Sequence, residues 1–352
     1  MEMVKKGLIA LLVVLASLVI ISCENEPTIS IPDVSTISLD YDVVRYDQIL
    51  AQLDTNNLKE EMEFVRAKHP EFTQLFFSRI LPFEAANNDE FLLNLKGYLS
   101  DERIKRLQDT VSLLFGDIEN NELADLEQSM KYMKHYFEDF SAPNVYTFTS
   151  EYTYQKFIFQ DGDEDGIGIG LDMFLGGDYD YKKIDPKNPA FSEYLTRSFS
   201  REHIVKMMME VLLDDQIGRV PGSRLIDYMI HNGKKLYMLE RVIPGIPDSI
   251  LYEYTSEQTE WVKNNELEMW AFFFEENLFY ESNSMKINKY ISPSPNSPGM
   301  PPKSPGKTAN YIGHQIVKAY MTKFPKTSIQ DLMGLKDSQY IMDKSRYKPK
   351  RK

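Results

Sequence analysis

Two consecutive helix-like segments, Ser200–Gln216 and Ser223–Val242, constrain the fold more than any other part of the chain. Apolar residues recur at every third or fourth position in both segments, and a short turn containing glycine and proline joins them. The pattern predicts two adjacent helices that bury most of their surface. Gly233 interrupts the apolar stripe of the second helix at a cost of about 1 kcal/mol relative to alanine. Its expected use is the close approach of another backbone.

The same two segments lack the metal-binding motif of a zinc peptidase. A zincin-type peptidase carries His-Glu-x-x-His on one helix, which places two imidazoles on one face with a glutamate beside them. Here residues 201–205 read Arg-Glu-His-Ile-Val, and no two of the five histidines are four positions apart. Asn232 in the second segment stands where a peptidase would have a further acidic ligand. The sequence therefore predicts no catalytic residue, no bound metal and no other cofactor.

The candidate binding site is a cleft between the two segments, at the place where a zinc peptidase would have its active site. A third segment, Ser256–Asn277, contains both tryptophans, and an aromatic helix of this kind is more often core than ligand platform. Glu202 and His203 could form an acid–base pair, although a charged first helical turn is the commoner arrangement. A metal would need ligands from separate positions, namely Glu202, His203, His231 and His314. The candidate cleft residues are Glu202, His203, His231, Asn232, Trp261, Glu266 and Trp270.

Residues 1–22 have the pattern of a lipoprotein signal peptide. Two lysines precede the apolar run Leu8–Ile21, which is followed by Ser22 and Cys23. The residues before Cys23 suit a lipoprotein signal peptidase, so Cys23 is the expected lipidation site, carrying acyl chains such as palmitate. The alternative is an uncleaved anchor helix with an incidental cysteine. Cys23 is the only cysteine in 352 residues, so an intramolecular disulfide is impossible and stability depends on the core.

The mature chain is acidic. Cleavage before Cys23 leaves 38 basic and 52 acidic residues, a formal charge of −14. This charge argues against nucleic acid as a partner and against binding anionic lipid through a basic surface. The acyl chains on Cys23 are therefore the expected contact with the membrane. The remaining length is sufficient to bury a large core without disulfides.

The hydrophobic period divides the rest of the chain into a tether, one mostly helical α+β domain over 39–343, and a tail. Helical spacing dominates both ends of the domain, and runs rich in valine, threonine and aromatic residues lie between them. The predicted parts are a polar tether over 23–38, a helical part over 39–140, a small antiparallel sheet over 144–181, a second helical part over 200–343 and a basic tail over 344–352.

One acidic turn inside the predicted sheet has the spacing of a calcium loop. Residues 161–166 read Asp-Gly-Asp-Glu-Asp-Gly, and Asp172 falls at the twelfth position of an EF-hand loop. The flanking residues have the pattern of strands where an EF-hand requires helices. A hairpin turn is therefore preferred over a calcium site, because aspartate and glycine tolerate positive φ.

Several strings in the C-terminal half resemble a known family. They are "GKKLYMLERVIP", "YTSEQTEWVKNNELEMWAFFFE", "IGHQIVKAYM" and "SRYKPK". The chain resembles the gliding-motility-associated lipoprotein family GldB, and the similarity extends upstream through Tyr41–Leu50 and "GIGLDMFLGGDYDY". That family is distantly similar to predicted zinc peptidases whose ligands it mostly lacks. The resemblance thus implies a degenerate zincin-like domain with a small sheet and preceding helices.

The resemblance also implies a function and a location. It points to a non-enzymatic lipoprotein, anchored in a membrane of the cell envelope and facing the periplasm. Such a protein would support gliding motility and type IX protein secretion together with other envelope proteins of that machinery. Two alternatives remain open at this point: a zinc-dependent peptidase with non-standard ligands, and a module that binds peptides or proteins in the former peptidase cleft. Exposure of Trp261 or Trp270 beside a cleft would favour binding over a purely structural role.

Overall fold

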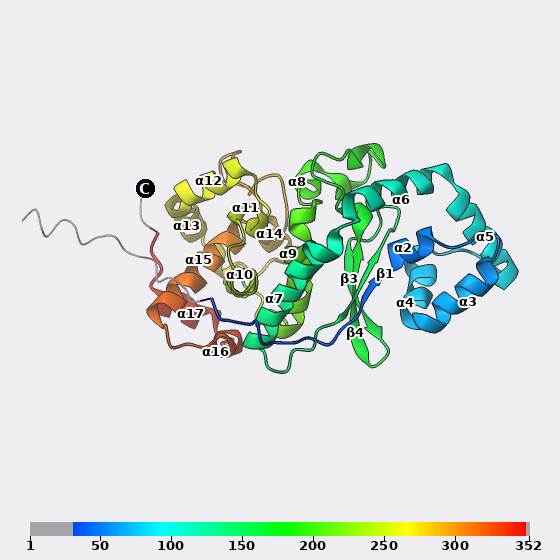
Figure 1. Cartoon of the computed structure of the whole chain (residues 1–352). Coiled ribbons are helices and arrows are strands. Elements are labelled where there is room, and N and C mark those ends of the chain that lie inside the picture. The colour runs from blue at the N-terminus through cyan, green and yellow to red at the C-terminus, as the bar shows by residue number, and fades with distance from the viewer. Residues whose placement is uncertain (1–30, 350–352) are drawn as a thin grey trace, which may run out of the picture. The chain divides into compact units, whose positions relative to one another are not determined.

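The computed structural model describes residues 31–349, and from Asp33 onward these residues form one unit. The signal peptide, Cys23 and the first half of the predicted tether lie outside the described residues, as do the last three residues of the basic tail. Helices dominate the unit, and a single four-stranded sheet lies among them (Figure 1). The prediction of a mostly helical α+β fold is confirmed.

The first group of helices lies between residues 46 and 136 of the chain. They are α2 (Tyr46–Ala51), α3 (Leu58–Lys68), α4 (Pro70–Leu75), α5 (Asn88–Ser100), α6 (Glu102–Phe115) and α7 (Glu122–Tyr136). Side chains cap two of them, because Asn87 accepts a hydrogen bond from the Glu90 backbone and Asp101 accepts one from the Arg103 backbone. Such caps satisfy amide groups that have no partner inside the helix.

The remaining helices follow the sheet. They are α8 (Glu193–Thr196), α9 (Ile204–Ile217), α10 (Leu225–Val242), α11 (Asp248–Tyr252), α12 (Ser256–Asn264), α13 (Glu266–Glu275), α14 (Ser284–Ile291), α15 (Thr308–Lys323), α16 (Ile329–Gly334) and α17 (Ser338–Ser345). The two helices of the predicted pair are α9 and α10, and a short 3-10 turn precedes α9. The aromatic segment expected as one helix is two, because the chain breaks at Asn265 between α12 and α13.

The sheet is mixed, whereas an antiparallel sheet was expected. Its strands are β1 (Val43–Arg45), β2 (Asn144–Phe148), β3 (Lys156–Asp161) and β4 (Glu164–Gly170), in the order β1-β2-β4-β3. The pairs β1–β2 and β2–β4 are parallel, and only β3–β4 is antiparallel. Parallel pairing requires a long connection, and helices α2 to α7 supply one between β1 and β2. That pairing depends on contacts distant in sequence, which local patterns do not specify.

The acidic turn forms a hairpin, as preferred from the sequence. Strands β3 and β4 pair up to Asp161 opposite Glu164, which leaves a two-residue loop. Gly162 in that loop has a φ of 67°, the left-handed conformation that favours glycine. The segments on both sides are strands and not helices, so the EF-hand arrangement is absent at these residues.

The sheet separates two hydrophobic cores. On one face, rings of β2 and β3 pack with helices α2 to α5 in an aromatic core, and on the other face aliphatic side chains of β4 join the main core. Figure 1 shows α2 to α5 on one side of the strands, with α10 and α15 on the other. The glycines of β4 make room for the rings: a Cβ on Gly166 would lie 2.3 Å from Phe159, and one on Gly168 would lie 2.6 Å from Phe157.

Helices α10 and α15 cross in the middle of the main core. A Cβ on Gly233 of α10 would lie 2.4 Å from the backbone of Gly313, so the predicted close approach of another backbone is confirmed. In the sequence, His314, the next residue of α15, falls outside the apolar stripe of that helix. It is fully buried, because α10 and α11 cover this side of α15 as well.

Candidate functional site

Two of the predicted cleft residues, Glu202 and His203, lie in the 3-10 turn before α9. The Ser200 hydroxyl contacts both, at 3.0 Å from Oε2 of Glu202 and 2.9 Å from Nδ1 of His203. Burial lowers the pKa of His203 to about 4, so the ring is neutral at pH 7. Glu202 is exposed and lines a groove of about 650 Å³ between α7, the start of α9 and the turn after α10.

His231 and Asn232 are neighbours on α10 but face different surroundings. His231 is buried beside Ile217 and Leu335, and this burial lowers its pKa to about 4. Asn232 points to the opposite side, where its amide donates to Oδ1 of Asn310 at 2.8 Å. Consecutive helical residues diverge by about 100°, so the two side chains do not share one site.

The three predicted cleft residues of the aromatic segment lie apart from the helix pair. Trp261 and Trp270 are half-buried and pack against the main core. Trp270 contacts Phe279 and Tyr347 through its ring. Glu266 accepts hydrogen bonds from the hydroxyls of Tyr311 at 3.2 Å and Tyr347 at 2.6 Å. This carboxylate therefore links α13 to α15 and to the C-terminal residues of the chain.

The histidines do not form a zinc site. His314 is buried between Tyr252, whose hydroxyl lies 2.7 Å from Nδ1, and Glu240, whose carboxylate lies 3.3 Å from Nε2. His203 and His231 occupy other elements and have other neighbours. Within residues 31–349, no three histidine, cysteine, aspartate or glutamate side chains gather closely enough to hold a metal ion. The donor set at the helix pair therefore does not fit zinc.

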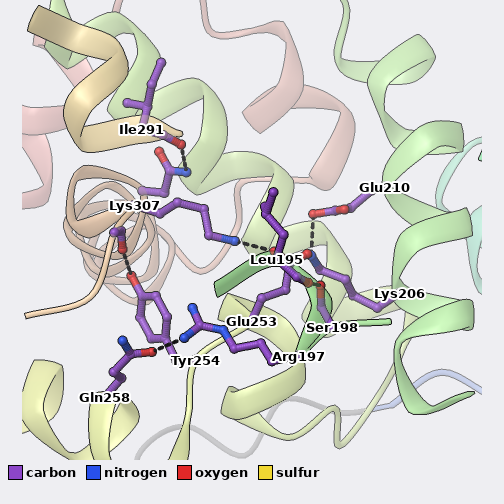
Figure 2. Close-up of polar contacts among 12 residues, drawn as sticks. Leu195, Arg197, Ser198, Lys206, Glu210, Glu253, Tyr254, Gln258, Ile291 and Lys307 are labelled. Carbon is purple, nitrogen blue, oxygen red and sulfur yellow. Dashed lines mark hydrogen bonds and ion pairs between the residues drawn. The ribbon is translucent and has the colours of Figure 1, made fainter. Parts of the chain in front are cut away.

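A largely buried charge cluster lies beside α9 and is made of Lys156, Lys206, Glu210, Glu253 and Lys307. Nζ of Lys206 lies 2.7 Å from Glu210 and 2.5 Å from Glu253. Lys307 approaches the other oxygen of Glu253 at 2.7 Å, and Lys156 approaches Glu210 at 3.5 Å. Figure 2 shows Lys206 between its two carboxylates, with Lys307 on the far side of Glu253.

Helical spacing and backbone conformation set the positions of these charges. Lys206 and Glu210 are one turn apart on α9, a spacing at which helical side chains meet. Glu253 follows α11 with a φ of 57°, and Lys307 precedes α15 with a φ of 56°. Left-handed backbone is uncommon for residues other than glycine and carries a conformational cost. The fold therefore accepts backbone strain at both ends of the Glu253–Lys307 ion pair.

Burial and pairing have opposite effects on the charges of the cluster. Burial alone would lower the pKa of Lys206, but the carboxylates of Glu210 and Glu253 raise that pKa above its ordinary value. Burial would likewise raise the pKa of Glu253, yet Lys307 and Lys206 hold it well below its ordinary value. Both groups are therefore charged at pH 7. For Lys307 and Lys156 burial prevails, and their pKa values are lowered.

Arg197 adds a further cation beside the cluster. Its guanidinium donates to Oε1 of Gln258 at 2.8 Å, as Figure 2 shows. Burial lowers the pKa of Arg197, and the nearby Glu253 carboxylate opposes that shift. Its buried Nε has no hydrogen-bond partner among the residues that the structure describes. The cluster and its neighbour thus contain four cations against two carboxylates.

A pocket of about 200 Å³ opens beside the cluster between α9, α10, α11 and the start of α15. Asn232 is the one predicted cleft residue in its wall. The lining residues are Lys206, Glu210, Asn232, Lys235, Leu236, Leu251, Tyr252, Tyr254, Ile291, Lys307 and Asn310. The charged residues of this lining were not predicted from the sequence, although the sequence does indicate two of them. Lys206 and Glu210 stand inside the otherwise apolar run of α9, where a charge must be buried and therefore paired.

The fold and site define a mostly helical α+β protein with a polar pocket and largely buried ion pairs beside its helix pair. Residues 28–349 match the family described as gliding motility protein GldB. The chain belongs to this GldB family, as its sequence strings indicated. No curated protein and no solved structure was found to match it. Over residues 31–349, the helices are too short or too polar to cross a membrane.

Proposed function

We propose that this protein is a lipid-anchored, non-enzymatic component of the cell envelope that supports gliding motility and type IX protein secretion. Membership of the GldB family over residues 28–349 supports the link to motility. The signal sequence ending at Ser22 supports anchoring through acyl chains on Cys23. The acidic domain would then face the periplasm, where its partners are other envelope proteins of the same machinery.

The non-enzymatic role is carried by one observation at the helix pair. A peptidase needs metal ligands and a free general base on these helices. Here the inner face of α9 presents the Lys206 ammonium, which is held by two carboxylates and cannot ligate a metal. The facing position on α10 is Asn232, whose amide is bonded to Asn310. We interpret the pair as a degenerate zincin-like site in which ion pairs have replaced the ligands.

Complementation of a gene deletion tests this proposal. Cells lacking the protein should lose colony spreading and the release of type IX cargo, and the wild-type gene should restore both. Glu202→Gln and His231→Gln should restore them equally well, because neither side chain transfers a proton or holds a metal in this proposal. If either variant is folded, normally localised and inactive, the non-enzymatic role is wrong. Normal spreading and secretion in the deletion strain would contradict the proposed function itself.

Metal analysis tests the same proposal on the purified protein. After dialysis, we expect far less than one zinc per chain, because a structural or catalytic site holds its metal stoichiometrically. About one zinc per chain would instead support the peptidase alternative with non-standard ligands.

A second candidate role is binding, and the pocket beside the charge cluster favours it. A structural subunit has no need of a polar pocket, whereas binding sites combine a cavity with a few directed polar groups. The half-buried tryptophans do not contribute to this pocket. The binding role would therefore rest on the charged residues of α9, α10 and α15.

A further inference from the structure

We propose that the pocket between α9, α10, α11 and α15 binds a small anionic group, a carboxylate or a phosphate, through Lys235 and Lys307. The proposal does not depend on a role in motility. It rests on the charge balance of the pocket, on its size and on the polar groups that line it.

The residues around the pocket carry more positive than negative charge. In the part of the chain that the structure describes, the ammonium groups of Lys156, Lys206 and Lys307 face two carboxylates, Glu210 and Glu253. Lys235 adds a fourth ammonium at the pocket wall, and its partner Asp214 is exposed to solvent. Buried charges are stable when they are balanced by opposite charge. An anion in the pocket would supply the missing negative charge.

Lys307 is the buried cation with the most to gain from an anion. Among the described residues its ammonium has one carboxylate partner, Glu253 at 2.7 Å, whereas Lys206 has two. An ammonium has three protons to donate, so Lys307 retains capacity for a ligand oxygen. Because Lys307 also lines the pocket, that capacity is available where a ligand would sit.

The volume of the pocket limits the size of the ligand that it can enclose. A volume of about 200 Å³ lies below the roughly 300–1,000 Å³ of pockets that enclose drug-sized ligands. A small carboxylate, a phosphate, or the anionic end of a longer molecule fits these limits.

Neutral polar groups fix the shape of the pocket. Asn310 donates to the carbonyl of Ile291 at 2.9 Å while accepting from Asn232. The hydroxyl of Tyr254 donates to the carbonyl of Gly306 at 2.8 Å, next to Lys307. These bonds hold the wall in place before a ligand arrives, which reduces the ordering cost of binding.

Thermal unfolding of the full mature protein in detergent tests the proposal. Sodium phosphate and sodium acetate are each titrated against sodium chloride at equal ionic strength. We expect one of the two probes to raise the Tm of the wild type by several degrees beyond the effect of chloride, since a ligand that binds only the folded state stabilises it. A response to phosphate alone assigns a phosphate group, and a response to acetate alone assigns a carboxylate.

Three variants make the test specific. Lys235→Gln should weaken the apparent affinity for the probe about tenfold or more, the effect of losing one charged contact. Lys235→Arg keeps the charge and should retain the response. Lys286→Gln is the matched control, because Lys286 is exposed, pairs with Glu281 at 2.8 Å and lies outside the pocket.

Lys235 is a suitable target because Asp214, its one ion-pair partner within residues 31–349, is exposed, so its replacement should not disturb the fold. A wild type that responds to neither probe would overturn the proposal. So would equal responses of Lys235→Gln and Lys286→Gln, which would show that the anions act on the whole surface. Neither result depends on whether the protein supports motility.

Discussion

Gly233 of α10 and Gly313 of α15 meet backbone to backbone, and neither position has room for a methyl group. A Cβ on Gly233 would lie 2.4 Å from the carbonyl of Gly313, and a Cβ on Gly313 would lie 1.8 Å from the carbonyl oxygen of Met229. Real Cβ atoms do not approach other atoms so closely. The two helices of the main core can therefore cross only where both lack a side chain.

Gly233→Ala should destabilise the protein even though alanine is the better helix former. The added methyl group must push the two helices apart, and such overpacking costs about 1–3 kcal/mol. Unfolding in guanidinium chloride, followed by circular dichroism, measures the change.

Gly97→Ala is the matched control on another helix. A Cβ on Gly97 of α5 would meet no atom within 4 Å. The same substitution should therefore stabilise the protein by about 0.5–1 kcal/mol, the ordinary gain of alanine over glycine in a helix. Equal effects of the two substitutions would contradict the packing argument.

Lys206→Met should destabilise the protein strongly. The substitution removes the cation shared by Glu210 and Glu253 and leaves buried carboxylates short of a partner. Breaking a buried ion pair from one side typically costs about 3–5 kcal/mol. Lys183→Met serves as control, because Lys183 and Asp180 form an exposed pair whose loss should leave the stability nearly unchanged. A Lys206→Met variant as stable as Lys183→Met would show that the cluster does not hold the fold together.

Asp172 predicts a specific pH dependence. This fully buried carboxylate accepts hydrogen bonds from the backbone amides of Ser150 at 3.0 Å and Tyr152 at 2.6 Å. Burial nevertheless raises the pKa of Asp172 from 3.8 to about 6. The folded state thus binds more protons than the unfolded state between these values. Through this residue, stability is highest below pH 4 and falls as the pH rises to 6.

Asp172→Asn isolates that effect, because asparagine is neutral and its carbonyl oxygen can accept the same hydrogen bonds. The difference in unfolding free energy between Asp172→Asn and the wild type should move by about 2–3 kcal/mol in favour of asparagine between pH 4 and pH 6. Other titrating groups, such as the buried His203 and His231, are common to both proteins and cancel in the difference. A difference that stays constant with pH would contradict the raised pKa.

Cys23→Ala should abolish lipidation and release the protein from the membrane. Stable anchoring requires acyl chains that alanine cannot carry. Metabolic labelling with an alkyne fatty acid measures lipidation, and fractionation measures release. Labelling of the alanine variant at the wild-type level would show that Cys23 is not the acylated residue.

The sequence predicted those features of the fold that local patterns determine. The helix pair, the hairpin at Gly162 and the close approach at Gly233 all follow from period, turn chemistry or glycine placement. The mixed sheet could not be predicted in the same way, because β1 pairs with β2 across about a hundred residues. A strand's period shows that it is paired, and leaves the direction of its partner open.

The candidate site was only partly accessible from sequence. Asn232 was identified as a position where a metal ligand is missing, and it does line the pocket. The charges beside this pocket come from Lys206, Glu253 and Lys307, which lie in three separate parts of the chain. Glu253 and Lys307 look like surface residues in the sequence. Only the packing of α11 and α15 against α9 shows that both are largely buried.

The two-faced sheet also determines how this protein can be divided. Alternate residues of β2 belong to different cores: Val145 contributes to the main core, while Tyr146 and Phe148 contribute to the aromatic one. Removing the N-terminal helices would leave those two rings, and the glycine face of β4, without their cover. A shortened protein lacking α2 to α5 would thus expose a hydrophobic aromatic surface and should aggregate. The N-terminal helices and the rest of the domain therefore depend on each other for stability.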